Sequence, residues 1–198
     1  MNERFYLGVR ALARVIMGVF FPYRAHGAEL IPKDGSFILC GNHQSLSDPI
    51  LAACAVNPPI RFMGKKELFV FKPLGAFMRG LGVFPVDRGK SDLSAMRAAL
   101  SILQAGSALG IFPEGRRAFK GGGDFQTGVA LIAIRSQKPV YPLYVARRAR
   151  LFRRSDLYFG DCVDLAEYKG KYDSETLKAV TARIRDAVYG LAPEKNVK

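Results

Sequence analysis

His43 and Asp48 lie five residues apart in the segment Asn-His-Gln-Ser-Leu-Ser-Asp and form the pair in this chain best suited to acid–base chemistry. An imidazole is largely neutral near pH 7, so His43 can take a proton from an alcohol. If the turn between the two residues folds back, the Asp48 carboxylate reaches the other ring nitrogen. There it would fix the tautomer and stabilise the imidazolium that forms. The pair would convert a hydroxyl group into a nucleophile.

Both residues also have simpler interpretations. Asp48 stands directly before Pro49, and an aspartate followed by proline is typical of a helix start, where the carboxylate caps free backbone amides. His43 could equally be a hydrogen-bonded turn residue with no part in catalysis. The sequence leaves these alternatives open, and a capping role is compatible with orienting a histidine.

Short apolar runs alternate with helical patterns along the chain, and one run ends just before His43. The apolar runs predict strands at 37–40, 60–63, 83–86, 108–112, 140–145 and 157–159. The spacing of apolar residues predicts helices at 49–56, 73–79, 91–104, 127–136 and 174–191. This order predicts an α/β fold, a single three-layer domain with a mostly parallel or mixed central sheet flanked by helices. Open sheets of this kind bind ligands at the carboxyl ends of their strands, where His43 would lie.

The charge of the chain points to an anionic partner. Its 198 residues include 30 Lys and Arg against 17 Asp and Glu, a formal net charge of +13. Nucleic acid, an acidic membrane surface and a phosphorylated substrate would each match this excess. At this length, one domain with one well-buried core is expected.

Residues that commonly bind metals are scarce. The only histidines are His26 and His43, and the three cysteines, Cys40, Cys54 and Cys162, are too widely spaced for a zinc site. We therefore expect neither a metal nor a cofactor. An odd number of cysteines in apolar surroundings favours free, buried thiols in a reducing compartment.

The segment 5–21 is strongly apolar but contains Arg10 and Arg14, which are four residues apart and therefore on one face of a helix. A helix that spans a bilayer needs about 20 apolar residues, and each central arginine would add a cost of several kcal/mol. A transmembrane helix is therefore not expected. The opposite face of the helix would carry Phe5, Leu12, Ile16, Val19 and Phe20.

We expect residues 1–24 to form a membrane-interfacial helix, with its apolar face in the lipid boundary and with Arg10 and Arg14 reaching anionic headgroups. The alternative is a helix that packs on the core of residues 25–198. A cleaved signal peptide is not expected, because arginines interrupt the apolar region and no small-residue cleavage site follows it.

Two predicted strands deliver arginines to the same edge of the sheet as His43. The block Gly-Val-Phe-Pro-Val-Asp-Arg ends in Arg88, and the block Phe-Pro-Glu-Gly-Arg-Arg ends in Arg117. A guanidinium group binds phosphate oxygens through two parallel hydrogen bonds, so two arginines beside a general base indicate a site for a phosphate-bearing alcohol. Alternatively, each arginine forms a surface ion pair with Asp87 or Glu114.

Taken together, these blocks resemble those of the glycerophospholipid acyltransferase family, in particular its 1-acyl-sn-glycerol-3-phosphate acyltransferases. The resemblance covers most of the chain and rests on four blocks in the family order, at 42–48, 82–88, 112–117 and 140–145. Four blocks in order are specific, whereas any one alone is not. Residues 25–198 would then form the acyltransferase domain.

The resemblance implies roles for individual residues, with catalysis assigned to His43 and Asp48. The substrate-binding residues that we expect, two of which would hold a phosphate, are Ser45, Lys65, Arg88, Glu114, Gly115 and Arg117. The chain departs from the family pattern at Arg116, which replaces the usual threonine, and after Phe125, where a common lysine is absent. These departures concern the acceptor site rather than the reacting groups.

The expected reaction is transfer of a fatty acyl group from a thioester, on coenzyme A or acyl carrier protein, to the sn-2 hydroxyl of lysophosphatidic acid. The protein would act at the cytoplasmic face of the cell membrane, as a peripheral or monotopic protein on an anionic membrane surface. Another lysolipid or an aminolipid is an alternative acceptor. A basic nucleic-acid-binding module is the alternative of a different class. Nucleic acid is not expected as a partner, because the chain lacks helix-turn-helix, zinc-finger and RNA-binding signatures. A serine hydrolase is not indicated either, because there is no Gly-x-Ser-x-Gly elbow.

Overall fold

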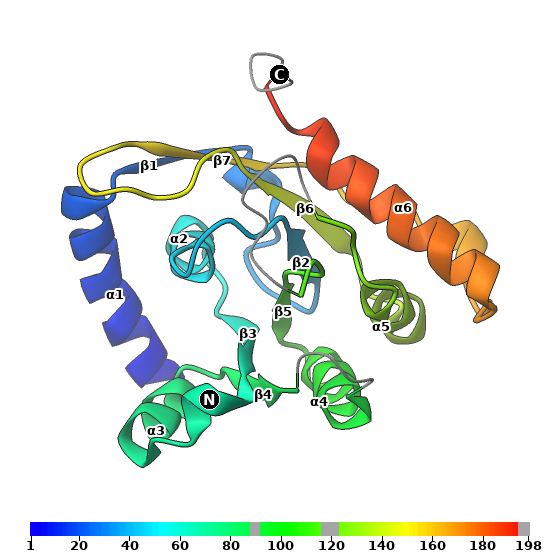
Figure 1. The fold of residues 1–198 in the computed structure, drawn as a ribbon, viewed down its shortest axis with the longest axis horizontal. Helices are drawn as coiled ribbons and strands as arrows, with labels where there is room; N and C mark the ends of the chain where they lie inside the picture. The colour runs from blue at the N-terminus through cyan, green and yellow to red at the C-terminus, as the bar shows by residue number, and fades with distance from the viewer. Residues whose placement is uncertain (88–91, 116–122, 194–198) are drawn as a thin grey trace.

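A seven-stranded sheet with helices on both faces forms the centre of the molecule (Figure 1). The computed structural model describes residues 1–87, 92–115 and 123–193. In spatial order, the strands are β1 (Tyr23–His26), β7 (Ser155–Phe159), β6 (Val140–Val145), β2 (Ile38–Gly41), β5 (Ala108–Ile111), β3 (Ile60–Lys65) and β4 (Phe84–Val86). Strands β6, β2, β5, β3 and β4 run parallel, whereas β7 is antiparallel to β6 and parallel to β1.

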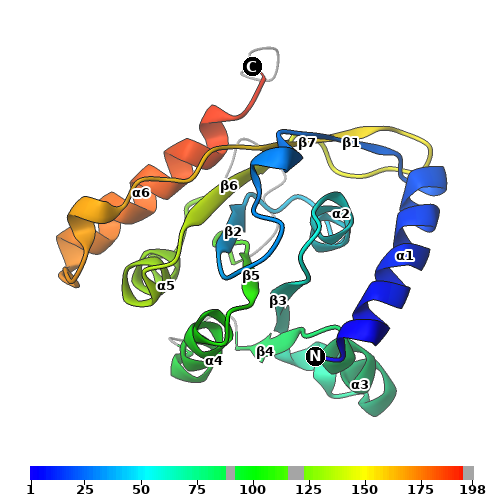
Figure 2. The ribbon, with the colours of Figure 1, turned by 180° about the vertical axis from the view of Figure 1, so that it is seen from behind.

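The helices form two layers. They are α1 (Glu3–Phe20), α2 (Asp48–Ala55), α3 (Lys72–Gly80), α4 (Leu93–Gln104), α5 (Gly128–Ser136) and α6 (Ser174–Gly190), with short 3-10 turns η1 (Ala28–Leu30), η2 (Lys66–Phe69) and η3 (Ala166–Tyr168). Helices α1 and α2 cover one face of the sheet, and α4, α5 and α6 cover the other (Figures 1 and 2). The predicted three-layer α/β fold is confirmed.

Strand β2 lies at the centre and is buried on both faces. Phe37 and Leu39 pack in the core beneath α2, while Ile38 and Cys40 pack in the core beneath α4, α5 and α6. A strand covered on both faces is a continuous apolar run, which is why this segment is recognisable in the sequence.

The route of the chain places a crevice next to β2. After β2 the chain passes to α2 on one face, whereas after the neighbouring strand β5 it passes to α5 on the opposite face. Loops that leave adjacent parallel strands in opposite directions open a crevice at the carboxyl ends of those strands. His43 and Glu114 follow these two strands.

Two expectations differ from the structure. Strand β1 was not predicted, because it has only four residues and two of them, Arg24 and His26, are polar. Cys40 and Cys54 are buried, but Cys162 is exposed just beyond the end of β7, so the expectation of three buried thiols is wrong.

Arg10 and Arg14 of α1 bind backbone carbonyls of the domain. Arg14 donates from Nε to the Cys54 carbonyl at 2.9 Å and from Nη2 to the Val56 carbonyl at 3.3 Å. Arg10 donates from Nη1 to the carbonyls of Asn57 at 2.5 Å and Val56 at 3.3 Å. The carbonyls at a helix C-terminus lack helical partners and carry partial negative charge, so they attract guanidinium groups. Both side chains are therefore bonded to the domain, and their contact with lipid headgroups stays a prediction.

The apolar face of α1 is consequently turned away from the protein. Leu12 and Val15 are 61% and 64% exposed, and the helix buries Tyr6 and Met17 against the domain. The large apolar side chains that α1 exposes are Phe5, Leu7, Leu12, Val15, Ile16, Val19 and Phe20. None of the helices in the described ranges combines the length and the hydrophobicity that crossing a bilayer requires.

Replacing Arg14 by alanine removes two charge-assisted hydrogen bonds between α1 and the end of α2. We expect the free energy of unfolding to fall by about 1–3 kcal/mol, as measured by urea denaturation. Arg4→Ala, at an exposed position on the same helix, should leave the unfolding midpoint nearly unchanged. Equal effects of the two substitutions would contradict this account of how α1 docks.

Candidate active site

His43 and Asp48 meet at the carboxyl end of β2. The His43 Nδ1 atom lies 3.0 Å from Asp48 Oδ2, and both side chains are buried. Because a carboxylate oxygen accepts hydrogen bonds, Nδ1 donates the proton and the lone pair of the ring lies on Nε2. This is the arrangement in which a histidine can remove a proton from a hydroxyl group.

The Asp48 carboxylate organises the turn that precedes it. Its Oδ2 atom accepts from the backbone amides of Gln44 and Ser45, both at 2.6 Å, and its Oδ1 atom accepts from the Ser45 hydroxyl at 2.8 Å. Helix α2 begins at Asp48 itself, and its N-cap Ser47 makes no side-chain capping bond. The carboxylate therefore closes the turn before it instead of capping the helix after it.

The turn is fastened to the neighbouring strand β6. Asn42 Nδ2 donates to the Val145 carbonyl at 3.1 Å, and the Val145 amide donates back to Asn42 Oδ1 at 2.7 Å. Gln44 Nε2 also donates to the Val145 carbonyl, at 2.7 Å. The residues on both sides of His43 are thus tied to the end of β6.

An aromatic ring supports the His43 imidazole from the side of β5. Phe112 stacks on His43 with ring centroids 4.6 Å apart and an interplanar angle of 25°. This contact limits rotation of the imidazole about its side-chain bonds. Together with the bond to Asp48, it holds the ring in one orientation.

Glu114 follows β5 and contacts the same turn. Its Oε2 atom accepts from the His43 backbone amide at 3.4 Å, and its Oε1 atom accepts from the Tyr189 hydroxyl at 2.6 Å. The Gly123 amide donates to the Tyr189 oxygen at 3.2 Å and lies 3.5 Å from Glu114 Oε1. Glu114 is buried and links the loops after β2 and β5.

Sequence reasoning missed Tyr189. Burial raises the pKa of its hydroxyl, and the hydrogen bond to the Glu114 carboxylate raises the pKa further, so the hydroxyl remains a donor at neutral pH. Tyr189 lies on α6, 75 residues from Glu114 in the chain. No local motif connects the two residues, so only the fold identifies this contact.

The other expected substrate-binding residues are distributed around this centre. Gly115 has φ +65°, in the left-handed region of backbone conformation that favours glycine. Ser45 is buried with its hydroxyl on Asp48, and Lys65 pairs with Glu67 at 3.0 Å near the end of β3. Two further residues, Arg88 and Arg117, lie outside the described residues.

Comparison with known proteins identifies the family to which this chain belongs. Residues 23–146, which include strands β1 to β6 and the whole turn from Asn42 to Asp48, match the family described as Acyltransferase. The chain belongs to the acyltransferase family.

Relatives extend the match to most of the acyltransferase chain. A 1-acyl-sn-glycerol-3-phosphate acyltransferase of Streptococcus pneumoniae is 32% identical over 81% of this chain, which spans 62% of that protein's length. One of Bacillus subtilis is 26% identical, and the match covers 88% of this chain and 90% of that protein. The crystal structure of the 1-acyl-sn-glycerophosphate (LPA) acyltransferase PlsC from Thermotoga maritima resembles the model with a TM-score of 0.72. That match is 26% identical and covers 94% of this chain and 79% of the other.

Tyr189→Phe removes one hydroxyl group and leaves Glu114 Oε1 without its closest donor. Because Glu114 contacts the His43 backbone, we expect kcat for acyl transfer to fall about tenfold, while KM changes little. The readout is steady-state thiol release. Tyr168→Phe, in η3, is the matched control and should change neither parameter. A Tyr189→Phe enzyme with the original kcat would show that Glu114 does not depend on this bond.

Proposed function

We propose that this acyltransferase moves a fatty acyl group from a thioester to the sn-2 hydroxyl of lysophosphatidic acid, giving phosphatidic acid. The observation that carries the proposal is the buried His43–Asp48 pair at the carboxyl end of β2, next to β5. The names of the bacterial relatives and of the PlsC structure support the same reaction. Family membership also favours acyl transfer over the nucleic-acid-binding alternative.

In the proposed mechanism, His43 Nε2 accepts the proton of the acceptor hydroxyl while the hydroxyl oxygen attacks the thioester carbonyl carbon. The tetrahedral intermediate collapses with cleavage of the carbon–sulfur bond, and the imidazolium returns the proton to the departing thiolate. The products are an ester and a free thiol, so no covalent acyl-enzyme is required. The Asp48 carboxylate stabilises the His43 imidazolium for as long as the imidazole ring holds the proton.

The acceptor phosphate would bind beside this centre. We assign it to Arg88 and Arg117, because the chain reaches both residues shortly after strands β4 and β5, whose carboxyl ends lie at the same edge as His43. Guanidinium groups suit phosphate oxygens in charge and geometry. The alternative acceptors are lysolipids with a larger or nitrogen-containing headgroup. Such a headgroup would require different contacts from the side chains at positions 88 and 117.

Exposed apolar side chains support binding to a membrane surface. Phe5 of α1 contacts Phe77 of α3 edge-on at 5.7 Å, and Phe20 lies 5.9 Å from Phe152 in the loop between β6 and β7. The exposed face of α1 therefore continues into α3 at one end and into this loop at the other. An apolar surface of this extent beside arginines is typical of an interfacial helix. We propose that residues 1–24 anchor residues 25–198 at the cytoplasmic face of the membrane.

His43→Ala tests the proposed base. With lysophosphatidic acid and an acyl thioester, we expect thiol release to fall at least about 1,000-fold, because the variant lacks the proposed general base. His26→Ala is the matched control, since His26 is the only other histidine and pairs with Asp156 away from the turn. Thiol release that survives in the His43→Ala enzyme would exclude His43 as the base.

Leu12→Glu combined with Val15→Glu tests the membrane surface. Two charges on the exposed face of α1 should weaken binding to phosphatidylglycerol vesicles at least about tenfold in a sedimentation assay, because charged groups resist transfer into the lipid boundary. Ala179→Glu with Ala182→Glu adds the same charge to exposed positions of α6 and should have a much smaller effect. Equal losses in the two variants would indicate general charge repulsion rather than insertion of α1.

A further inference from the structure

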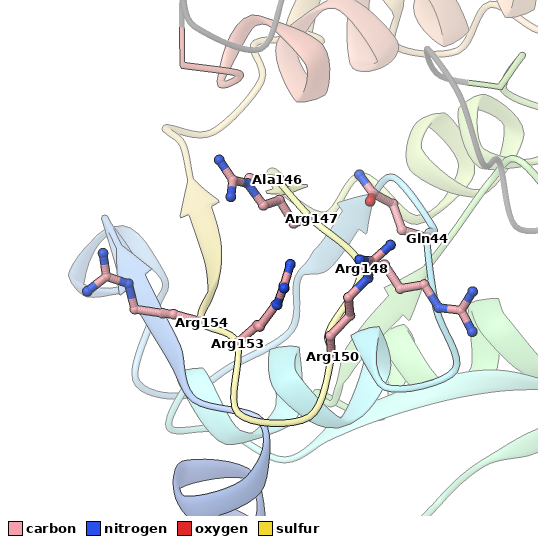
Figure 3. A pocket seen from close by; sticks show the side chains of 7 residues that line it. All are labelled: Gln44, Ala146, Arg147, Arg148, Arg150, Arg153 and Arg154. Carbon is pink, nitrogen blue, oxygen red and sulfur yellow. The ribbon is translucent and has the colours of Figure 1, made fainter.

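The loop between β6 and β7 forms a strongly basic cavity beside the catalytic turn. Arg147, Arg148, Arg150, Arg153 and Arg154 line a cavity of about 460 Å³ together with Gln44 and Ala146, and we call it the arginine pocket (Figure 3). No acidic residue contributes to this lining. Like charges gathered around one cavity repel each other, and a bound anion reduces this repulsion.

The backbone of the loop holds this arrangement in place. The Phe152 amide donates to the Phe20 carbonyl at 2.7 Å, and the Ser155 hydroxyl donates to the Arg147 carbonyl at 2.7 Å. The Arg153 amide donates to the Arg150 carbonyl at 3.0 Å, and Phe152 adopts a left-handed φ of 56°. The backbone of the loop is therefore ordered, and the arginine side chains extend from a defined turn.

The side chains differ in direction. Figure 3 shows Arg150 and Arg153 extending from the far end of the loop toward Arg147 and the end of β6, whereas Arg154 extends away from them. Arg154 also lies 4.0 Å from Asp156 Oδ1. Arg150 and Arg153 are thus the residues best placed to bind an anion within the pocket.

The pocket lies on a defined side of the catalytic histidine. Gln44, which lines it, directly follows His43 and is bonded to the end of β6. Strand β6 flanks β2 on one side, while β5, β3 and β4 follow on the other. Strands β4 and β5, after which we assign the acceptor phosphate, lie on that second side. His43, at the end of β2, therefore has the arginine pocket on one side and the carboxyl ends of these strands on the other.

We propose that the arginine pocket binds the phosphate groups of the acyl donor, a phosphopantetheine thioester. This inference rests on the proposed function, because that reaction needs two phosphate-bearing substrates that meet at His43. An acceptor phosphate held near β4 and β5 leaves the β6 side for the donor. Coenzyme A carries a diphosphate and a 3′-phosphate, whose several negative charges match a pocket of five arginines.

Anionic lipid headgroups are the competing ligand, because the loop tip exposes Leu151 and Phe152 next to Phe20. Two features favour the donor. A headgroup at a membrane surface needs no cavity, and it needs no contact with Gln44 beside the catalytic base. The phosphates of a phosphopantetheine carrier are separated from its thioester by the pantetheine arm, so a phosphate-binding cavity that extends from Gln44 along the loop suits such a donor.

The test combines Arg150→Ala with Arg153→Ala. Free coenzyme A is titrated into the protein by calorimetry, and KM is measured for palmitoyl-coenzyme A and for lysophosphatidic acid. We expect coenzyme A binding to weaken by about 100-fold, since each charge-assisted contact contributes about tenfold. The KM of the donor should rise at least about tenfold and the KM of the acceptor less than twofold. Arg150→Lys with Arg153→Lys should recover part of the affinity, because it restores the charge.

The matched control is Lys169→Ala with Lys178→Ala, which removes two exposed cations near η3 and in α6, at the opposite side of the molecule (Figures 1 and 2). It should change neither KM. The same measurements with palmitoyl-acyl carrier protein and with dephospho-coenzyme A thioesters distinguish the sources of phosphate. In the unaltered protein, the KM of the dephospho-coenzyme A thioester is compared with that of the coenzyme A thioester. If the first KM is higher and this difference disappears in the double variant, coenzyme A is identified as the donor. A donor effect seen only with the carrier protein identifies that carrier.

An unchanged KM for both donors, palmitoyl-coenzyme A and palmitoyl-acyl carrier protein, together with unchanged coenzyme A binding in the Arg150→Ala, Arg153→Ala protein would overturn the proposal. Loss of binding to phosphatidylglycerol vesicles without any donor effect would also overturn it and would assign the pocket to lipid headgroups. Failure of the proposed function has a different signature. In that case the unaltered protein releases no thiol with any donor in the presence of lysophosphatidic acid.

Discussion

The buried carboxylate of Asp48 is the group on which the site depends. A carboxylate removed from water is strongly destabilising unless hydrogen bonds replace its hydration. Here all of the donors bonded to it come from residues 43–45, as two backbone amides, one hydroxyl and one imidazole nitrogen. The turn must therefore wrap around the carboxylate, and this wrapping positions the His43 ring. Satisfying one buried charge and orienting the base are the same structural event.

The surrounding sheet holds this turn from two sides. Val145 of strand β6 forms hydrogen bonds with Asn42 and Gln44 of the turn. Glu114, in the loop after β5, accepts a hydrogen bond from the His43 backbone amide. Glu114 in turn depends on Tyr189 from the last helix. The site thus depends on contacts from strand β6 and from helix α6. Removal of α6 would therefore disturb the catalytic centre as well as the core.

The sequence predicted those features that leave a local signature. Alternating apolar runs and helical patterns yielded the α/β fold, and the spacing of His43 and Asp48 indicated their contact. Three features could not be predicted from the sequence, for physical reasons. The Glu114–Tyr189 bond joins residues 75 positions apart, so it follows from packing alone. Periodicity revealed that α1 has two unlike faces but not that the face bearing Arg14 meets the protein. Strand β1 is too short and polar for its pairing with β7 to show.

The pairing of β1 with β7 also sets an order of assembly. Tyr23 aligns with Ser155, so the strand that follows α1 has no partner until most of the chain has left the ribosome. The docking site of α1 at the end of α2 is synthesised much earlier, near residue 57. Helix α1 can therefore dock on α2 while the sheet is still open at the edge next to β1. Pairing of β7 with β1 then completes the sheet at that edge.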